Sequence, residues 1–312
     1  MPADGWQLSP TVVGPVDGPS QLLRAFIQYL RARPTKAESE GTRLHDGSSG
    51  LEGVSRGTSE LGGVPAITLE PQVGRPDRTV LYFHGGGYIS GSPPERHLPL
   101  AAAVALAANA RVHVLDYRLA PETRFPGAFD DCLRAYSWLV THGGVDPETL
   151  AVLGDSVGGN LAVAVTAAAR DQGLALPVRV AVISPMADLT FTGASIEERK
   201  SLDPLVTREM LELSVTEYLA GADPHDPRCS AIFADMHGFP PTLIQVGENE
   251  ILYDDAIRLR DAATAAGVDV AFESWRHGIH VWPMFISAGL PESAGAVERL
   301  ATFFKTDDER RA

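Results

Sequence analysis

From residue 64 onward, short apolar segments alternate with longer segments of helical spacing, and this order restricts the fold most. Parallel strands need a long crossover between them, commonly a helix, so the alternation predicts a mostly parallel sheet with helices on both faces. The chain has 312 residues, 44% of them hydrophobic, which is enough for one large core. The expected strands are Ala66–Leu69, Thr79–Phe83, Val112–Leu115, Leu150–Leu153, Val178–Ile183, Thr242–Val246 and Val270–Trp275, with an edge strand near Val54. The expected helices between them are Leu98–Ala108, Ala128–Thr141, Asn160–Gln172 and Asp254–Ala266.

Two segments depart from this alternation. More than fifty residues, rich in charge and proline, separate the strand ending near Ser184 from the strand starting at Thr242. That is too long for a simple crossover, so we expect an insertion folded over the sheet edge, with a helix at Thr207–Leu219. Near the N-terminus we expect one helix, capped by Ser20 and ended by Pro34. Its apolar face would consist of Leu22, Leu23, Phe26, Ile27 and Leu30.

Composition excludes several classes of protein. The net charge of −14 argues against nucleic-acid binding, which requires clustered Lys and Arg. We see no signal peptide at the N-terminus, and the longest apolar run, Leu98–Ala108, is too short to span a bilayer. Cys132 and Cys229 are far apart and show no metal-binding spacing, so we expect free thiols in a reducing cytoplasm. We expect neither a metal nor an organic cofactor.

The segment Gly154–Gly158 reads G-x-S-x-G between an apolar strand segment and the start of an Ala-rich helix. A serine on a sharp strand-to-helix turn projects its hydroxyl clear of the sheet, and flanking glycines let the helix approach closely. This context favours Ser156 as an acyl-transfer nucleophile. The alternative is a chance Gly/Ser loop.

The segment His84–Tyr88 begins with H-G-G-G directly after a predicted buried strand. Attack by a serine turns a carbonyl oxygen into an oxyanion, which needs hydrogen-bond donors aimed at it. Three consecutive glycines allow backbone N–H groups to turn into a cavity. We therefore expect an oxyanion hole here, against the alternative of a flexible glycine loop.

With these motifs, the chain resembles the hormone-sensitive-lipase family of α/β-hydrolases, bacterial carboxylesterases that carry H-G-G-G and G-D-S-A-G-G. Asp116–Glu122 matches the family's D-Y-R-L-A-P-E, Ser184–Thr190 resembles S-P-W-x-D-L-T, and Pro241–Gly247 resembles the strand before the catalytic acid. The likeness covers most of residues 64–304 and implies an α/β-hydrolase fold with a helical cap. It divides the chain into an N-terminal cap segment (1–50), a catalytic core (51–185 and 241–312) and a cap insertion (186–240). Cap residues such as Leu205, Met210 and Leu213 would line the pocket or pack against the core.

The catalytic acid and base must follow the nucleophile in the order Ser, Asp/Glu, His. The family pattern G-x-x-D-x-L places Glu250 at the acid position, where relatives usually have Asp. The competing acids are Glu248, Asp254 and Asp255. The last two are expected to open a helix, where acidic side chains favour the positive end of the dipole.

The family motif H-V-[FW] matches His280–Trp282, so the resemblance identifies His280 as the base. We expect His277 at the pocket rim or the surface, and His84 in a structural role that holds the glycine loop. The histidines His97 and His237 are not bases in this scheme.

The residue after the nucleophile supplies one oxyanion donor, and here it is Val157, where the family normally has Ala. With Gly85 and Gly86, Val157 completes the predicted oxyanion hole. Its β-branched side chain predicts a restricted acyl pocket. For the nearby acids Asp155 and Glu122, the resemblance implies structural hydrogen bonds.

We therefore predict a cytoplasmic serine carboxylesterase that hydrolyses small, short-acyl-chain esters through an acyl-enzyme. The alternative is a lactonase, an amidase or a peptidase that uses the same nucleophile, acid and base. A non-catalytic binding protein of this fold is disfavoured because Ser156, Glu250 and His280 are all present. The sequence itself does not fix the oligomeric state. The family often dimerises through an edge strand, so the resemblance suggests a homodimer through the edge strand near Val270–Trp275.

Overall fold

One sheet organises the computed structural model, which describes residues 11–14, 18–32, 50–92 and 94–305. In this part of the chain the sheet has nine strands in the order β1-β9-β8-β7-β6-β4-β5-β3-β2. The strands are β1 (Thr11–Val13), β2 (Val54–Leu61), β3 (Val64–Pro71), β4 (Arg78–Phe83), β5 (Ala110–Leu115), β6 (Leu150–Asp155), β7 (Arg179–Ile183), β8 (Thr242–Gly247) and β9 (Val270–Trp275). Only the pairs β2–β3 and β3–β5 are antiparallel, so the predicted mostly parallel sheet is confirmed.

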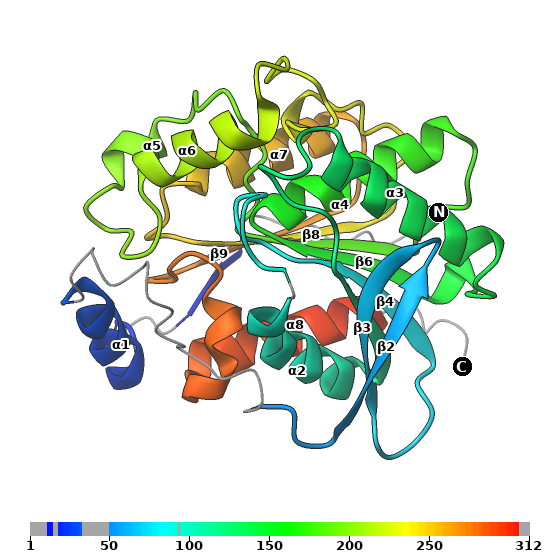
Figure 1. Ribbon diagram of the computed structural model, residues 1–312. Helices are drawn as coiled ribbons and strands as arrows, with labels where there is room; N and C mark the ends of the chain where they lie inside the picture. The colour runs from blue at the N-terminus through cyan, green and yellow to red at the C-terminus, as the bar shows by residue number, and fades with distance from the viewer. Residues whose placement is uncertain (1–10, 15–17, 33–49, 93, 306–312) are drawn as a thin grey trace, which may run out of the picture.

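Helices cover both faces of this sheet. They are α1 (Gln21–Arg31), α2 (Leu98–Ala108), α3 (Gly127–Thr141), α4 (Val157–Asp171), α5 (Ser195–Glu198), α6 (Arg208–Leu219), α7 (Tyr253–Ala265) and α8 (Pro291–Lys305). Short 3₁₀ turns lie at η2 (Glu95–His97), η3 (Pro147–Thr149), η4 (Ala231–Phe233) and η5 (Trp282–Ala288). Figure 1 shows α2 and α8 on one face, and α3, α4 and α7 on the other.

Consecutive strand residues supply two separate cores. Leu81 and Phe83 of β4 belong to the cluster under α3, α4 and α7, whereas Val80 and Tyr82 belong to the cluster under α2 and α8. Side chains alternate between the faces of a strand, so a strand apolar at every position must be buried on both sides. The continuous apolar runs of the sequence therefore have a direct structural reason.

The N-terminal helix forms where it is predicted, but the prediction that Leu22 belongs to its buried face is wrong, because Leu22 is half exposed. In α1 the side chain of Ser20 accepts a hydrogen bond from the Leu23 N–H at 3.0 Å, and Leu23, Ile27 and Leu30 are buried. Phe26 packs on Phe285 of η5 with the ring centroids 4.7 Å apart. Helix α5 contacts α7, and Figure 1 shows α5 and α6 of residues 186–240 on the side of the sheet opposite to α2 and α8. The division into cap and core remains a prediction, and residues 1–10, 15–17 and 33–49 lie outside the described residues.

The expectation that Val270–Trp275 forms the sheet edge is wrong. Strand β1 pairs in parallel with β9, joining Thr11 to Glu273 and Val13 to Trp275. The outer backbone hydrogen-bonding groups of β9 are therefore already paired from Glu273 to Trp275. An edge-to-edge dimer at this half of β9 would have to involve β1. None of the described helices is long and apolar enough to cross a membrane.

Two glycines set the distance between the sheet and α4. A Cβ atom on Gly158 would clash with the carbonyl oxygen of Phe83 in β4, and a Cβ on Gly154 would clash with that of Gly158. Backbone carbonyls cannot move aside as a flexible side chain can. The N-terminus of α4 can therefore lie against β4 and β6 only because both positions are glycine.

We expect Gly158→Ala to lower the free energy of unfolding by at least about 2 kcal/mol, because the added methyl meets fixed backbone. Gly57→Ala is the matched control, since a Cβ there meets nothing within 4 Å. It should change stability by no more than about 0.5 kcal/mol. Denaturant unfolding of both variants measures this, and equal effects would contradict the close approach at Gly158.

Candidate active site

The turn from β6 to α4 places Ser156 in an unusual backbone conformation. Its φ is 53° and its ψ is −121°, a combination that residues other than glycine rarely adopt. The Ser156 N–H donates to the Ile183 carbonyl at 2.9 Å, and the Ser156 carbonyl accepts from the Gly159 N–H at 3.0 Å. These bonds anchor the strained turn to β7 and α4, so the backbone that carries the Ser156 hydroxyl is held in place.

The loops after β6, β8 and β9 bring three predicted residues together. His280 Nε2 lies 3.1 Å from Ser156 Oγ, and His280 Nδ1 lies 3.0 Å from Glu250 Oε2. Parallel strands end at the same edge of the sheet, which is why residues 124 and 30 positions apart from His280 meet there. Both distances are those of hydrogen bonds.

The Glu250 carboxylate is fully buried and fixed on both oxygens. Besides its contact with His280, it accepts hydrogen bonds at Oε1 from Ser184 Oγ at 2.7 Å and from the Gly247 N–H at 2.6 Å. Ser184 Oγ in turn accepts from the Val281 N–H at 3.0 Å. Ser184 thus joins the acid to the residue after the histidine. Ser184 begins a segment that resembles the family's S-P-W-x-D-L-T, but the sequence alone assigns this serine no role.

The competing acids have other partners. Asp254 accepts from the Ser195 N–H at 3.0 Å, and Asp255 accepts from the Ala187 and Asp188 N–H groups at 2.9 Å each. Glu248 contacts Ser274 Oγ at 3.5 Å. In the described part of the chain, Glu250 is the carboxylate that His280 contacts as an ion pair.

Charges around His280 favour its protonated form. Burial lowers the pKa of His280, but the hydrogen bond and charge of Glu250, with the charges of Asp203 and Asp155, outweigh burial and raise the pKa above its usual value. Asp203 is a buried residue that sequence reasoning missed. It accepts the Leu205 and Val206 N–H groups on one oxygen and the Ile251 N–H, at 3.1 Å, on the other.

The glycine loop differs from prediction at one position. The Gly85 N–H donates to Asp155 Oδ1 at 3.0 Å, so Gly85 is not available as an oxyanion donor, and that prediction is wrong. The N–H groups of Gly86, Gly87 and Val157 donate to no acceptor among the described residues. An N–H in the first turn of a helix has no partner within that helix, so Val157 can serve a ligand.

Asp155 holds the glycine loop against the turn that carries Ser156. Its Oδ1 also accepts from the Tyr82 hydroxyl at 2.7 Å, and its Oδ2 lies 3.6 Å from His97 Nε2. Burial raises the pKa of Asp155, but the charge and hydrogen bond of His97 and the hydrogen bond of Tyr82 outweigh it and keep the pKa below its usual value. The structural role expected for Asp155 fits these contacts. Glu122 is exposed and its side chain has no partner among the described residues, so the role expected for it is wrong.

The remaining histidines lie outside the Ser156–His280–Glu250 contacts. His84 Nδ1 lies 2.6 Å from the Gly85 carbonyl, and burial with the nearby charge of His97 lowers the pKa of His84 to about 3. His84 is therefore neutral and braces the loop, as expected. His237 is exposed beside Asp235, and His277 is half-buried with a φ of 62°. No group of three or more His, Cys, Asp or Glu in the described residues is arranged to hold a metal ion.

Comparison with known proteins gives one consistent result. Residues 80–284 match the family model of the alpha/beta hydrolase fold. An acetyl-hydrolase of Streptomyces hygroscopicus is 44% identical over 229 residues, covering 73% of this chain and 76% of that protein. An ethyl acetate hydrolase of Pseudomonas putida is 36% identical over 197 residues, covering 61% of each protein. The crystal structure of an esterase from the bacterial hormone-sensitive lipase family is similar with a TM-score of 0.86 and 39% identity, covering 92% of this chain and 98% of that one.

We expect Asp155→Asn to destabilise the protein by about 3 kcal/mol, because the amide has no negative charge and only one acceptor oxygen. It therefore cannot accept from Tyr82 and Gly85 at one end and also face His97 with an acceptor at the other. Asp171→Asn, at the exposed end of α4 beside Arg170, is the control and should cost at most about 0.5 kcal/mol. Chemical unfolding measures both. If the two variants were equally stable, Asp155 would not hold the loop.

Proposed function

The chain belongs to the hormone-sensitive-lipase family of α/β-hydrolases and is a carboxylic ester hydrolase, and on that basis we propose that Ser156, His280 and Glu250 perform the reaction. The observation that carries this proposal is the chain of two contacts, Ser156 Oγ to His280 Nε2 and His280 Nδ1 to Glu250 Oε2. A serine hydroxyl is a weak nucleophile until a base accepts its proton, and the base needs a third group to orient it.

In the first half of the reaction, Ser156 Oγ attacks the ester carbonyl carbon while its proton passes to His280 Nε2. The carbonyl oxygen becomes negative and accepts the N–H groups of Gly86, Gly87 and Val157. His280 then returns the proton to the alkoxide oxygen, so the alcohol leaves and an acyl-Ser156 ester remains. Each oxyanion donor in such a site typically contributes about 3 kcal/mol to transition-state stabilisation.

In the second half, water attacks the acyl-Ser156 carbonyl as His280 accepts one water proton. Collapse of the second tetrahedral species breaks the bond to Ser156 Oγ, which regains its proton from His280, and the carboxylic acid leaves. Hydrogen bonds from Ser184 Oγ and the Gly247 N–H hold the Glu250 carboxylate in place. It stabilises the imidazolium and fixes the ring so that Nε2 faces Ser156.

We propose short acyl chains as the preferred substrates. Relatives named acetyl-hydrolase and ethyl acetate hydrolase support this choice. The side chain of Val157 is fully buried next to the nucleophile, and the restricted acyl pocket expected from it remains a prediction. We also propose a reducing compartment such as the cytoplasm, since Cys132 and Cys229 are both free and buried.

A homodimer through the outer edge of the sheet remains a proposal. It would pair β1 (Thr11–Val13), or the uncovered first half of β9, with a second copy. The molar mass in solution tests it.

The p-nitrophenyl esters of acetate, butyrate, octanoate and laurate test the substrate class directly. We expect kcat/KM to be highest for acetate or butyrate and to fall by at least about tenfold at laurate, because methylenes that do not fit cost binding energy. Ser156→Ala should lower turnover at least about 10⁴-fold. A lactone and an anilide in the same series distinguish a lactonase or an amidase. Best turnover of laurate, or an active Ser156→Ala variant, would contradict the proposal.

The role of Glu250 has its own test. We expect Glu250→Gln to lower kcat by about 10³- to 10⁴-fold, because a neutral amide cannot stabilise the imidazolium and can select the wrong tautomer. Asp254→Asn, four residues away, should stay within about threefold of the parent protein. Steady-state kinetics of both variants measure these effects. Loss of activity in Asp254→Asn with near-normal activity in Glu250→Gln would identify Asp254 as the catalytic acid instead.

The pH dependence of kcat/KM reports the ionisation of His280 in the free enzyme. Only the neutral ring accepts a proton, so activity should fall as pH drops through its raised pKa, with a midpoint above the free-histidine value of about 6.5. In Glu250→Gln, the midpoint of the remaining activity should move to lower pH. Burial lowers the pKa of His280, and the variant lacks the Glu250 charge that raises it. Protonated His280 stabilises the fold below about pH 6.5, and this contribution is lost as pH rises through the folded pKa. An unchanged midpoint in Glu250→Gln would contradict the pairing.

A further inference from the structure

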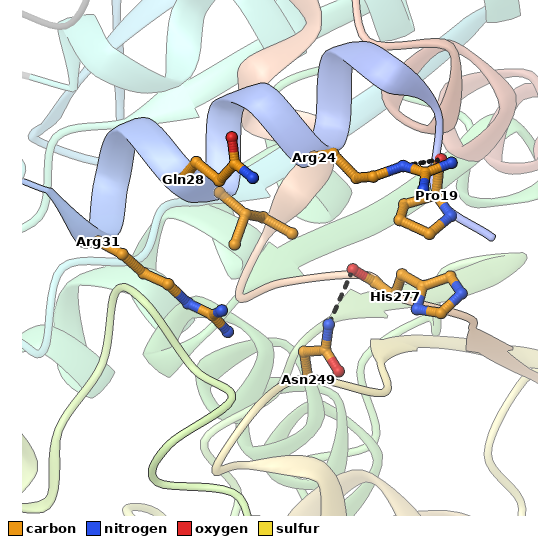
Figure 2. Close-up of a pocket in the computed structure, with 7 residues that line it drawn as sticks. Pro19, Arg24, Gln28, Arg31, Asn249 and His277 are labelled. Atoms are coloured by element: carbon orange, nitrogen blue, oxygen red, sulfur yellow. Dashed lines mark hydrogen bonds between the residues drawn. The ribbon is translucent and has the colours of Figure 1, made fainter.

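A pocket of about 210 Å³ lies between α1 and the two loops that lead to Glu250 and His280. Arg24, Gln28 and Arg31 line it from α1, and Asn249 and His277 line it from the loops after β8 and β9 (Figure 2). None of Ser156, Glu250 and His280 is among its lining residues. The pocket is therefore separate from the proposed catalytic residues, although each loop residue lies close to one of them in sequence.

The lining of this pocket is cationic in a chain of net charge −14. Two arginines and a histidine face it, and no Asp or Glu is among its lining residues. Arg24 Nε donates to the Pro19 carbonyl at 3.1 Å, and Arg31 Nη2 donates to the Leu202 carbonyl at 3.2 Å. Both guanidinium groups are thus held by backbone oxygens, which carry no formal charge.

Neither Arg24 nor Arg31 forms an ion pair within the described residues. Arginines elsewhere in the chain generally have carboxylate partners, for example Arg56 with Glu95 and Arg208 with Glu212. Arg24 and Arg31 lie seven residues apart, about two turns along α1. Without carboxylate partners among the described residues, two such arginines attract an anion into the space between them, especially at low ionic strength.

The loop side of the pocket is preorganised. Asn249 Nδ2 donates to the His277 carbonyl at 3.3 Å, and the Asn249 N–H donates to the Gly278 carbonyl at 2.9 Å. The left-handed φ of His277 turns its carbonyl toward Asn249. Figure 2 shows the Arg31 guanidinium and the Asn249 amide on one side of the pocket, and Arg24 and the His277 ring on the other. A bound anion would meet donors from both walls.

We propose that this pocket binds a small organic anion through carboxylate or phosphate oxygens held by Arg24 and Arg31. The planar guanidinium fork matches the oxygens of either group with two parallel hydrogen bonds. An occupant contacting α1, Asn249 and His277 together joins the N-terminal helix to the loops that carry Glu250 and His280. The site is thus a second ligand site, beyond the ester site, that links α1 to the loops of the acid and base.

The test uses the full chain carrying Ser156→Ala, so that binding is measured without turnover and does not depend on the proposed reaction. Isothermal titration with succinate and, separately, with inorganic phosphate is carried out at low ionic strength, with sodium chloride as the salt control. We expect saturable binding with one site per chain. Arg24→Gln and Arg31→Gln should each weaken it about tenfold, as expected for the loss of one charged hydrogen-bond donor.

Arg56→Gln is the matched control, because it also removes one exposed arginine but lies on β2, at the opposite end of the sheet from β1. It should leave affinity unchanged. Binding of succinate alone assigns the pocket to carboxylates, and binding of phosphate alone assigns it to phosphate groups; both support the proposal. Binding that neither Arg24→Gln nor Arg31→Gln weakens, or no saturable binding of either anion up to about 50 mM, overturns it.

Discussion

The contact between the start of α4 and the ends of β4 and β6 is the constraint on which the site depends. Gly154 and Gly158 allow backbone to meet backbone there, with no room for a Cβ atom at either position. The turn between them forces Ser156 into a positive φ, and hydrogen bonds to Ile183 and Gly159 hold it. The same approach places the first turn of α4 against the carbonyl groups of Phe83 and His84, where the glycine loop after β4 begins. Nucleophile and oxyanion donors are thus consequences of one packing arrangement, because neither can shift without moving the helix against the sheet.

The positions of His280 and of the glycine loop depend on two buried carboxylates, Glu250 and Asp155, whose oxygens all have hydrogen-bond or ion-pair partners. Glu250 is tied to Ser184, Gly247 and His280, and Asp155 performs the equivalent task for the glycine loop. Such groups are costly to bury unless every oxygen is satisfied. Their satisfaction explains how a glutamate, one methylene longer than the family's usual aspartate, still meets the histidine. Hydrogen bonds from Ser184 and Gly247 hold its side chain in that position.

The sequence predicts what depends on local pattern, and it fails where the answer depends on distant partners. Periodicity and strand length predicted the sheet, and motif order predicted that Ser156, Glu250 and His280 would meet. Strand β1 was missed because it has only three residues, of which Val12 is half exposed, and so short a segment shows no alternation of apolar and polar side chains. Its pairing partner in β9 lies some 260 positions away in the sequence. Gly85 was misassigned because a motif does not say which N–H another residue has already engaged. Ser184 and Asp203 were missed because partners from other loops define their place in the site: Glu250 and Val281 for Ser184, and Ile251 for Asp203.

The proposed reaction requires Ser156 to be a nucleophile activated by its surroundings, and covalent labelling measures that directly. A fluorophosphonate probe, with the modified residue located by peptide mass spectrometry, should label the parent chain once, at Ser156. The Ser156→Ala variant should then remain unlabelled. Labelling at a different residue, or an unlabelled chain that still hydrolyses esters, would contradict the account.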